Sequence, residues 1–377
     1  MDITLNIYFI AMLAVSAYFF LMASLNIIEM KLNTAKPRIT TGRMVSVLVP
    51  ARNEENNIEN CINSLLNQTY QNYEILIIDD NSGDNTWQIL EKLAKENSRV
   101  RVFKGKPLPK DWYGKPFALQ QLYEHAAGEI LLFTDADTVH KATSISWAVT
   151  NMEKTKADFV SGYVGQRLIT FGEITTVPIM FFMTGFVIPM FLNRFIKLGY
   201  FSAAVGQYIV MKTKVFKDIE GYANIRKKTS EDIYLSRYVK NLGYKTEFLD
   251  MADQVKCRMY EGYGAAVNGL GKNIFDFMGK RVPLLAPIAF AILIFFVMPF
   301  PLMFFLIAVQ DQFMYHCIAV NILFTATWIV MFLGRRINWR FAFFWPFMYG
   351  NLLIMVLWSG FRTVSGKGFE WKGRVVR

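Results

Sequence analysis

Long stretches without charged residues lie at both ends of the chain, and they limit what it can fold into. No Asp, Glu, Lys or Arg occurs between Asn6 and Ile28. Three further apolar stretches follow one another from Leu284 onward. A helix rises about 1.5 Å per residue, so about 20 such residues cross the roughly 30 Å core of a bilayer. The charged residues concentrate between Lys31 and Arg281. We therefore expect membrane segments at both ends of one domain at residues 44–280.

The first apolar stretch, residues 1–30, is expected to be an N-terminal transmembrane helix. A signal peptide would begin with basic residues, whereas here Lys31, Lys36 and Arg38 follow the stretch. Basic flanks stay in the cytoplasm, so we expect a multi-pass protein of the cell membrane with a cytoplasmic domain. The net charge of +11 fits these flanks and anionic lipid. No interleaved aromatic and basic ladder occurs, so no nucleic acid partner is expected.

The C-terminal apolar region, residues 284–362, is expected to contribute two to three spans, followed by a basic tail at 363–377. The loop at 310–312 lacks positive charge and is expected outside, whereas Arg335 and Arg336 mark an inside loop. Three full spans would place the tail outside, which its Lys and Arg residues argue against. We expect a cytoplasmic tail and one re-entrant stretch, and which stretch this is stays open.

The middle of the chain alternates short apolar runs with helical patterns. Val45–Val49 ends at Pro50, and Tyr73–Ile78 ends in acidic and polar residues that begin with Asp79. Such a β-α-β-α-β order predicts a doubly wound α/β half that binds a nucleotide at the carboxyl ends of its strands. The chain lacks G-x-G-x-x-G and G-x-x-x-x-G-K-[ST], which argues against a dinucleotide oxidoreductase and a P-loop NTPase.

Two carboxylates follow the apolar run Ile130–Thr134. Alternation along an extended chain would place Asp135 and Asp137 on the same side. Such a pair at a strand end can hold a divalent cation and, through it, a phosphate, although a solvated polar turn is the alternative. The three cysteines have no metal-ligand spacing, and with only three histidines a His-based metal or Ser-His-Asp site is not expected.

Two further positions carry charge at expected helix starts. Lys115 precedes a helix expected at 117–125, where one cation and free backbone N–H groups suit a diphosphate; an ordinary surface lysine is the alternative. Glu231 and Asp232 open another helix after Thr229 and Ser230. Ser or Thr followed by acids is also an ordinary helix cap.

Four motifs in this order resemble family 2 glycosyltransferases of the GT-A fold over about residues 44–255. They are Val47–Glu54, Ile77–Thr86, Gly114–Lys115 and Asp135–Asp137. The resemblance implies a nucleotide-sugar donor, an inverting transfer and Mg²⁺ or Mn²⁺ at Asp135 and Asp137. It implies Asp232, with its neighbour Glu231, as the catalytic base. The residues implied to bind the nucleotide-sugar are Pro50, Arg52, Asn53, Glu54, Asp79, Asp80, Lys115 and Asp135.

Other segments bear on the acceptor. The uncharged stretch 178–192, rich in Met and Phe and broken by Pro189, is expected as an interfacial or re-entrant helix near a lipid acceptor. A buried helix of the domain is the alternative. Gln-x-x-Arg-Trp, which processive members of the family carry, is absent, and this puts long-chain synthesis in doubt. Arg258 and Lys272 would neutralise the leaving diphosphate or contact lipid headgroups.

Short matches narrow the resemblance further. Trp112–Lys115 and Glu370–Arg374 are similar to bacterial carotenoid glycosyltransferases of the 4,4'-diaponeurosporenoate type and to hopene-associated enzymes. They suggest acceptor or diphosphate contacts at Trp112, Tyr113, Trp371 and Arg374. The expected function is transfer of one sugar, glucose, from a UDP-sugar to a membrane lipid, such as a carotenoid. The alternatives are a diacylglycerol, hopanoid or sphingolipid-like hydroxyl as acceptor, a small polysaccharide synthase, and a non-catalytic scaffold.

Overall fold

The computed structural model of the chain describes residues 3–228, 230–277, 281–371 and 373–376, without the side chains of 275–277, 370–371 and 374–376. The chain divides into two units. The first, here the helical unit, comprises Met1–Glu29, Leu168–Pro189 and Met259–Arg377. The second, the sheet unit, comprises Met30–Arg167 and Met190–Arg258. The chain therefore passes between the units four times.

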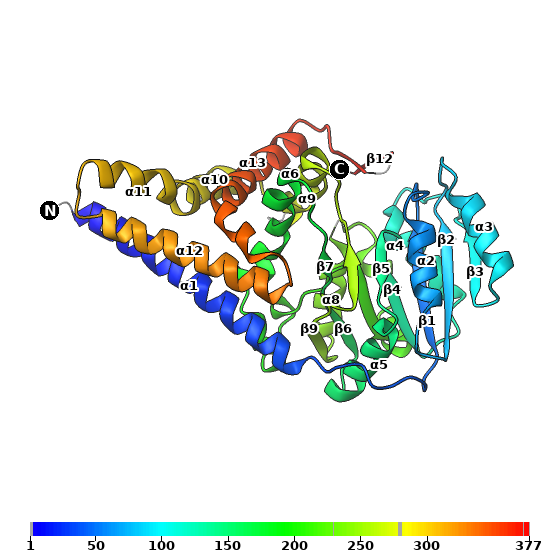
Figure 1. The fold of residues 1–377 in the computed structure, drawn as a ribbon. Helices are drawn as coiled ribbons and strands as arrows, with labels where there is room; N and C mark the ends of the chain where they lie inside the picture. Colours follow the sequence, from blue (N-terminus) through cyan, green and yellow to red (C-terminus); the bar gives the residue numbers. More distant parts are fainter. Residues whose placement is uncertain (1–2, 229, 278–280, 372, 377) are drawn as a thin grey trace. The chain divides into compact units, whose positions relative to one another are not determined.

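A mixed sheet of seven strands forms the centre of the sheet unit (Figure 1). Neighbouring strands follow the order β3-β2-β1-β4-β8-β6-β9, in which β8 is antiparallel to β4 and β6 and every other neighbouring pair is parallel. The parallel part confirms the doubly wound half expected from the sequence. The strands are β1 (Val45–Ala51), β2 (Tyr73–Asp79), β3 (Val100–Lys104), β4 (Ile130–Thr134), β6 (Phe159–Tyr163), β8 (Tyr208–Lys212) and β9 (Thr246–Asp250).

Helices cover the sheet because its central strands are apolar on both faces. Every residue of β2, β4 and β6 is buried, as in sheets that are covered on both sides. On one face, Leu48, Phe133 and Met211 of the sheet pack with Leu119 and Leu235 of two helices. The helices of this unit are α2 (Ile58–Leu66), α3 (Thr86–Glu96), α4 (Gly114–Glu124), α5 (Ser144–Thr155), α7 (Thr213–Asp218) and α8 (Glu231–Asn241).

A second, small sheet lies in the same unit. It joins β5 (Thr138–His140) to β10 (Val255–Cys257) and β10 to β7 (Gly165–Gln166). Because β5 follows directly from the turn after β4, this sheet brings the last residues of the unit toward Asp135 and Asp137.

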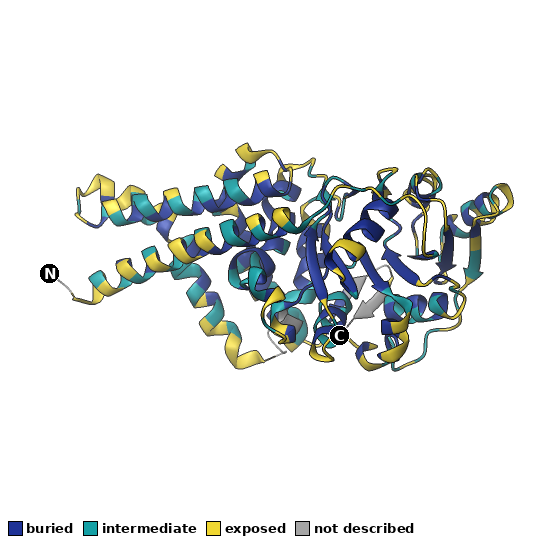
Figure 2. Cartoon of the chain, turned by 90° about the horizontal axis from the view of Figure 1, so that it is seen from below, coloured by how far each residue is buried: buried dark blue, intermediate teal, exposed yellow. Residues whose placement is uncertain are grey.

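The helical unit contains the long apolar helices. Among the described residues, α1, α12 and the helical segment at 339–364 are long and apolar enough to cross a membrane, and the bent pair at 282–308 would be a fourth span. These helices expose many large apolar side chains, which suits a lipid environment (Figure 2). The helices are α1 (Ile3–Asn33, whose last residues belong to the sheet unit), α6 (Phe171–Thr176), α9 (Tyr263–Phe277), α10 (Leu285–Ile292), α11 (Pro299–Ala308), α12 (Met314–Gly334) and α13 (Trp345–Val364).

The Met- and Phe-rich stretch at 178–192 forms short, irregular turns. They are η1 (Val177–Met180), η2 (Phe182–Val187) and η3 (Met190–Arg194). The buried Asn26 amide of α1 donates to the carbonyls of Gly185 and Ile188, at 3.1 and 2.9 Å. These contacts satisfy backbone groups that a regular helix would have paired internally. Phe186 packs edge-on against Trp328 of α12, so η2 is held between two apolar helices.

Candidate active site

The loops that follow β1 and β2 are tied together at the carboxyl ends of these strands. Ala51 pairs with Asp79 in the parallel ladder, so both strands end at the same level. The Arg52 guanidinium donates to the carbonyls of Asp80 and Asn81, at 2.6 and 2.8 Å. The backbone N–H of Gly83 donates to the Asn53 side chain at 2.8 Å. Residues expected to hold the nucleotide thus form one surface.

Three acidic residues of these loops are buried rather than solvated. The carboxyl groups of Asp79 and Asp80 are buried, and Asp79 accepts from the Ser82 N–H at 3.2 Å. Glu54 is also buried, and its N–H donates to the Thr86 hydroxyl at 2.8 Å. The expected nucleotide-binding residues are therefore held in place before any ligand arrives.

Asp135 and Asp137 follow β4 in a turn. The Thr138 hydroxyl donates to the Asp135 carbonyl at 2.7 Å and the Thr138 N–H to the same carbonyl at 3.3 Å. The expectation that the two acids share one side of an extended chain is therefore wrong. Ala136 and Asp137 form the turn, and Thr138 begins the next strand, β5. A turn, rather than strand alternation, presents both carboxylates.

Lys115 lies in the first turn of α4 and joins carboxylates from two other segments. Its Nζ is 2.5 Å from Asp135 Oδ1 and 3.5 Å from Glu231 Oε1. Burial alone lowers the pKa of Lys115, but Asp135 and Glu231 more than offset this and raise the pKa above its ordinary value. Lys115 therefore carries a full charge at neutral pH. It retains 32% of its side-chain surface exposed, so a ligand can still reach it.

Asp232 completes this group at the start of α8. Its carboxylate accepts from the backbone N–H of Gly206 and of Ile233, both at 2.8 Å. Burial raises the pKa of Asp232, and the nearby Lys115 and the two N–H donors oppose that rise without cancelling it. A raised pKa makes the carboxylate a better proton acceptor.

The helix-cap alternative for this segment is not what the described residues show. Ser230 precedes α8 but makes no side-chain cap hydrogen bond there, while Thr229 lies outside the described residues. Glu231 and Asp232 instead direct their carboxylates toward Lys115 and Gly206. We call Lys115, Asp135, Glu231 and Asp232 the acidic cluster. Its members come from three segments that converge at one edge of the sheet.

Sequence reasoning missed a chain of contacts behind Asp137. The Gln166 amide donates to Gln207 Oε1 at 3.0 Å, and Gln207 Nε2 donates to Cys257 Sγ at 3.0 Å. The Cys257 thiol is hydrogen-bonded to Asp137, and burial together with the carboxylates raises the pKa of Cys257 well above its usual value. The thiol therefore stays protonated and acts as a donor. No sequence signal marks this, because 120 residues separate the two side chains.

The residues around Asp135 and Asp137 fit a hard divalent cation. Both carboxylates raise the pKa of the buried thiols Cys61 and Cys257, which places them in one neighbourhood. The structure's described residues contain no group of three or more His, Cys, Asp and Glu side chains arranged around a metal. Two carboxylates leave most positions of an octahedral ion to water and phosphate oxygens, as Mg²⁺ sites with substrate phosphates usually do.

The remaining expected residues are not all at this cluster. Trp112 packs against the hydrophobic core and lies 5.6 Å from the Phe117 ring, whereas the Tyr113 N–H donates to the Arg226 carbonyl. Arg258 is half-buried at the end of the sheet unit, directly after Cys257. Lys272 belongs to the helical unit, and the side chains of Trp371 and Arg374 lie outside the described residues. Their roles stay predictions.

Comparison with known proteins identifies the central domain. Residues 46–220 match the family model described as glycosyl transferase family 2. The beta-monoglucosyldiacylglycerol synthase of Trichormus variabilis is 43% identical over 95 residues, which cover 25% of this chain and 20% of that protein. A glucosyltransferase of Escherichia coli, the UDP-Glc:alpha-D-GlcNAc-diphosphoundecaprenol beta-1,3-glucosyltransferase WfaP, is 28% identical over 274 residues, covering 63% of this chain and 98% of that protein.

Among solved structures, the mannosyltransferase PcManGT of Pyrobaculum calidifontis, in complex with GDP-Man and Mn²⁺, has the same fold. Its TM-score is 0.55 at 17% identity, over 94% of this chain and 99% of that one. The matched segment spans less than half the length of several curated relatives. The sheet unit of this chain therefore has the GT-A fold, and its residues 46–220 match glycosyl transferase family 2.

Proposed function

We propose that the protein transfers one sugar, glucose, from a UDP-sugar to a membrane lipid, with inversion at the anomeric carbon. The observation that carries the proposal is the acidic cluster. It sets a cation and three carboxylates at the edge of the sheet where the loops that follow β1 and β2 also lie. Two kinds of relative support the acceptor class: one is named for a glucosyldiacylglycerol product, the other for a diphosphoundecaprenol acceptor. The apolar helices of the same chain suit such acceptors.

On the donor side, Asp80 and the Pro50–Glu54 turn would hold the uridine. Lys115 and the N–H groups at the start of α4 would face the diphosphate, since a helix N-terminus favours anions. Asp135 and Asp137 would hold Mg²⁺ or Mn²⁺, which would offset the charge that builds on the departing UDP. Arrival of the diphosphate would give Lys115 a third anionic partner beside Asp135 and Glu231.

On the acceptor side, Asp232 would take the proton of an acceptor hydroxyl. The hydroxyl oxygen forms the new bond to the anomeric carbon as the bond from that carbon to UDP breaks, and the proton passes to the Asp232 carboxylate. The two N–H donors on Asp232 would hold it in place for this step.

Within this class we propose a carotenoid, such as diaponeurosporenoate, as the acceptor. This rests on the short matches at Trp112–Lys115 and Glu370–Arg374. A carotenoid carboxylate has a pKa near about 4 to 5 and is ionised at pH 7, so it would need no base. A hydroxyl acceptor, such as a diacylglycerol, would need one. The acceptor class can therefore be read from the role of Asp232.

The proposal is tested with membranes that carry the protein, labelled UDP-glucose, Mn²⁺ and a mixed lipid extract. Label should appear in the organic phase and disappear in Asp137→Ala, while Cys317→Ala, a substitution of a buried residue of the helical unit, serves as the matched control. Label in an aqueous or insoluble polymer would show a polysaccharide synthase instead. No incorporation from any UDP-sugar would refute the proposal.

A further inference from the structure

Three large apolar side chains of the sheet unit face solvent. Leu32 is 75% exposed, Phe195 79% and Leu198 61%. Leu32 belongs to the last turn of α1, and the other two lie in the loop that follows η3. Isolated exposed apolar residues are common on soluble surfaces, whereas a group of them marks a contact surface. Whether these three form a group depends on how their segments are joined.

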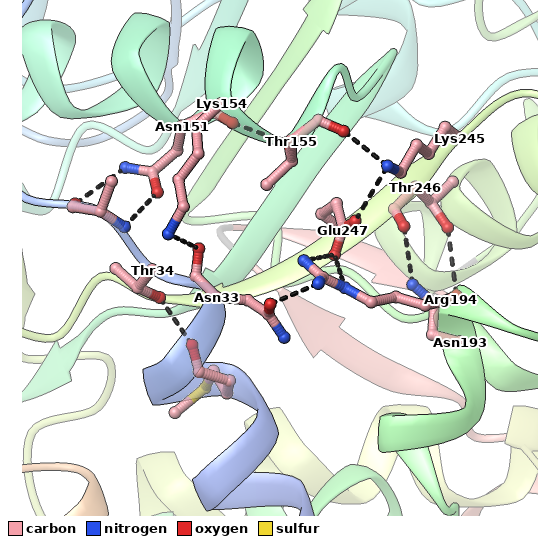
Figure 3. Close-up of polar contacts among 12 residues, drawn as sticks. Asn33, Thr34, Asn151, Lys154, Thr155, Asn193, Arg194, Lys245, Thr246 and Glu247 are labelled. Carbon is pink, nitrogen blue, oxygen red and sulfur yellow. Dashed lines mark hydrogen bonds and ion pairs between the residues drawn. The ribbon is translucent and has the colours of Figure 1, made fainter.

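A polar network joins the two segments (Figure 3). Arg194, the residue before Phe195, contacts the side chain of Asn33, the residue after Leu32. Arg194 also pairs with the buried Glu247 of β9, at 3.1 and 3.2 Å. The Asn33 carbonyl, in turn, accepts from Lys154 of α5 at 3.1 Å. The end of α1 and the loop after η3 are therefore fixed side by side on the sheet unit.

The same two segments are basic. Residues 30–43 contain four Lys or Arg and no acid, and residues 190–200 contain two Lys or Arg and no acid. Lys31, Lys36 and Lys197 are exposed. The Glu247 carboxylate that pairs with Arg194 is buried. Exposed apolar side chains among lysines match an anionic bilayer surface, where the apolar groups enter the interface and the lysines meet lipid phosphates.

The position of these residues along α1 points to the same partner. With 31 residues α1 is about 46 Å long at about 1.5 Å per residue, longer than a bilayer core of about 30 Å. Its N-terminal part is uncharged until Glu29, so Lys31 and Leu32 would lie where a membrane-spanning α1 leaves the core. A surface fixed to this end of the helix is held near the headgroups.

We propose that Leu32, Phe195 and Leu198, with Lys31, Lys36 and Lys197, form a juxtamembrane patch that docks the sheet unit on an anionic membrane surface. The occupant is the lipid headgroup region, rather than a second copy of the chain or another protein. The inference does not depend on the sugar or on the acceptor. It would hold even if the proposed transfer reaction were wrong.

The test uses the full chain reconstituted in vesicles of phosphatidylglycerol and phosphatidylcholine. All three native cysteines are buried, so a cysteine introduced at an exposed position can be labelled selectively with an environment-sensitive fluorophore. The variants are Phe195→Cys and Leu198→Cys. Lys92→Cys, exposed on α3, is the matched control. Quenchers attached to lipid and dissolved in water then report what surrounds the label.

Labels at Phe195→Cys and Leu198→Cys should show blue-shifted emission and quenching by the lipid quencher, whereas Lys92→Cys should be quenched from water. Replacing Lys197 by Gln should lower the ratio of docked to undocked protein about fivefold in anionic vesicles, because one lysine near such a surface shifts this equilibrium by about that factor. Quenching from water at position 195 would overturn the proposal. Protection from both quenchers would overturn it as well, since protein would then cover the patch.

Discussion

Gly206 shows how closely the charged groups of the sheet unit approach the backbone. A Cβ placed on this residue would lie 2.9 Å from Lys115 Nζ and 3.4 Å from Asp232 Oδ2. The nearer atom is the end of a flexible side chain, so an added methyl group would move the ammonium rather than unfold the protein. Glycine is needed here for the space it leaves beside its own N–H donor.

We therefore expect Gly206→Ala to fold normally and to lose kcat by about 10- to 100-fold, because small displacements of catalytic groups have effects of this size. The melting temperature and steady-state rates provide the measurement. Gly264→Ala, where nothing lies within 4 Å of the added methyl group, is the control and should retain wild-type rates. An unchanged kcat in Gly206→Ala would show that Lys115 and Asp232 are not positioned through this turn.

The second prediction for a single residue concerns the Cys257 thiol. Its thiol donates to Asp137, so it orients one of the two carboxylates expected to bind the metal. Removing such an outer partner typically weakens metal affinity by about 10- to 100-fold. Cys257→Ala should weaken Mn²⁺ binding, measured by electron paramagnetic resonance titration without donor, and Cys257→Ser should restore most of it. Equal Mn²⁺ affinities in all three proteins would contradict this role.

Asp232 gives a prediction with a defined pH dependence. Because its pKa is raised, Asp232 loses its proton only at a pH above the ordinary range of an aspartate. Activity with a hydroxyl acceptor should therefore rise with pH, and the midpoint of this rise should lie above 3.8. In Asp232→Asn this activity should be lost. A carboxylate acceptor should be used by Asp232→Asn as well, with no such rise. Profiles of kcat/KM against pH for each acceptor make the distinction.

At the scale of elements, the Arg194–Glu247 pair ties the loop after η3 to β9. Glu247 is almost fully buried, whereas Arg194 is partly exposed. Removing one partner of a buried pair costs about 3–5 kcal/mol when the other charge stays buried. Arg194→Ala should therefore destabilise the protein more than Glu247→Ala, because only the first leaves a buried carboxylate. The loss should stay below that range, since Lys245 Nζ remains 3.8 Å from Glu247. The double substitution to Met and Leu should recover much of the loss, and thermal unfolding in detergent would measure all three.

The parallel half of the sheet could be predicted because each of its strands is a local signal. The runs at β1, β2 and β4 are apolar, end in polar residues and alternate with amphipathic helices. The place of β8 between β4 and β6 could not be predicted, since it reverses direction and comes from 40 residues or more away in sequence. The strands β5, β7 and β10 have two or three residues each, too short to leave a pattern.

The candidate site was predictable to the extent that its residues sit in motifs. Lys115, Asp135 and Asp232 come from separate motifs, and the structure brings them together. Gly206 and Cys257 had no such signal. Their contacts depend on tertiary placement, and a lone glycine or cysteine carries no local pattern that would distinguish it from others in the chain.

At the scale of the whole molecule, the apolar helices allow more than one membrane topology. These topologies differ in the side of the bilayer on which the tail lies. After the sheet unit come the bent pair at 282–308, α12 and the helical segment at 339–364. Three crossings would place the tail opposite the sheet unit, and two would place it on the same side. The positive-inside rule and the tail's Lys and Arg residues favour the same side.

We expect Ser365→Cys and Lys92→Cys to react with an impermeant thiol reagent from the same face of sealed vesicles. The side from which Gln310→Cys, in the loop after α11, reacts would then show which apolar stretch is re-entrant. Vesicles of the opposite orientation provide the control. Reaction of Ser365→Cys from the other face would contradict two crossings.

The four passages of the chain between its two units also determine the order in which the protein can be completed during synthesis. The strand β6 pairs with β8 and β9, and the last residue of β9 follows the end of β6 by about 90 residues. At about 5–20 residues per second, a ribosome needs roughly 4 to 18 s for that length. Until β9 is complete, one side of β6 remains an unpaired edge, of the kind that promotes aggregation. Biogenesis of this protein therefore depends on protecting a half-built sheet while apolar segments emerge between its strands.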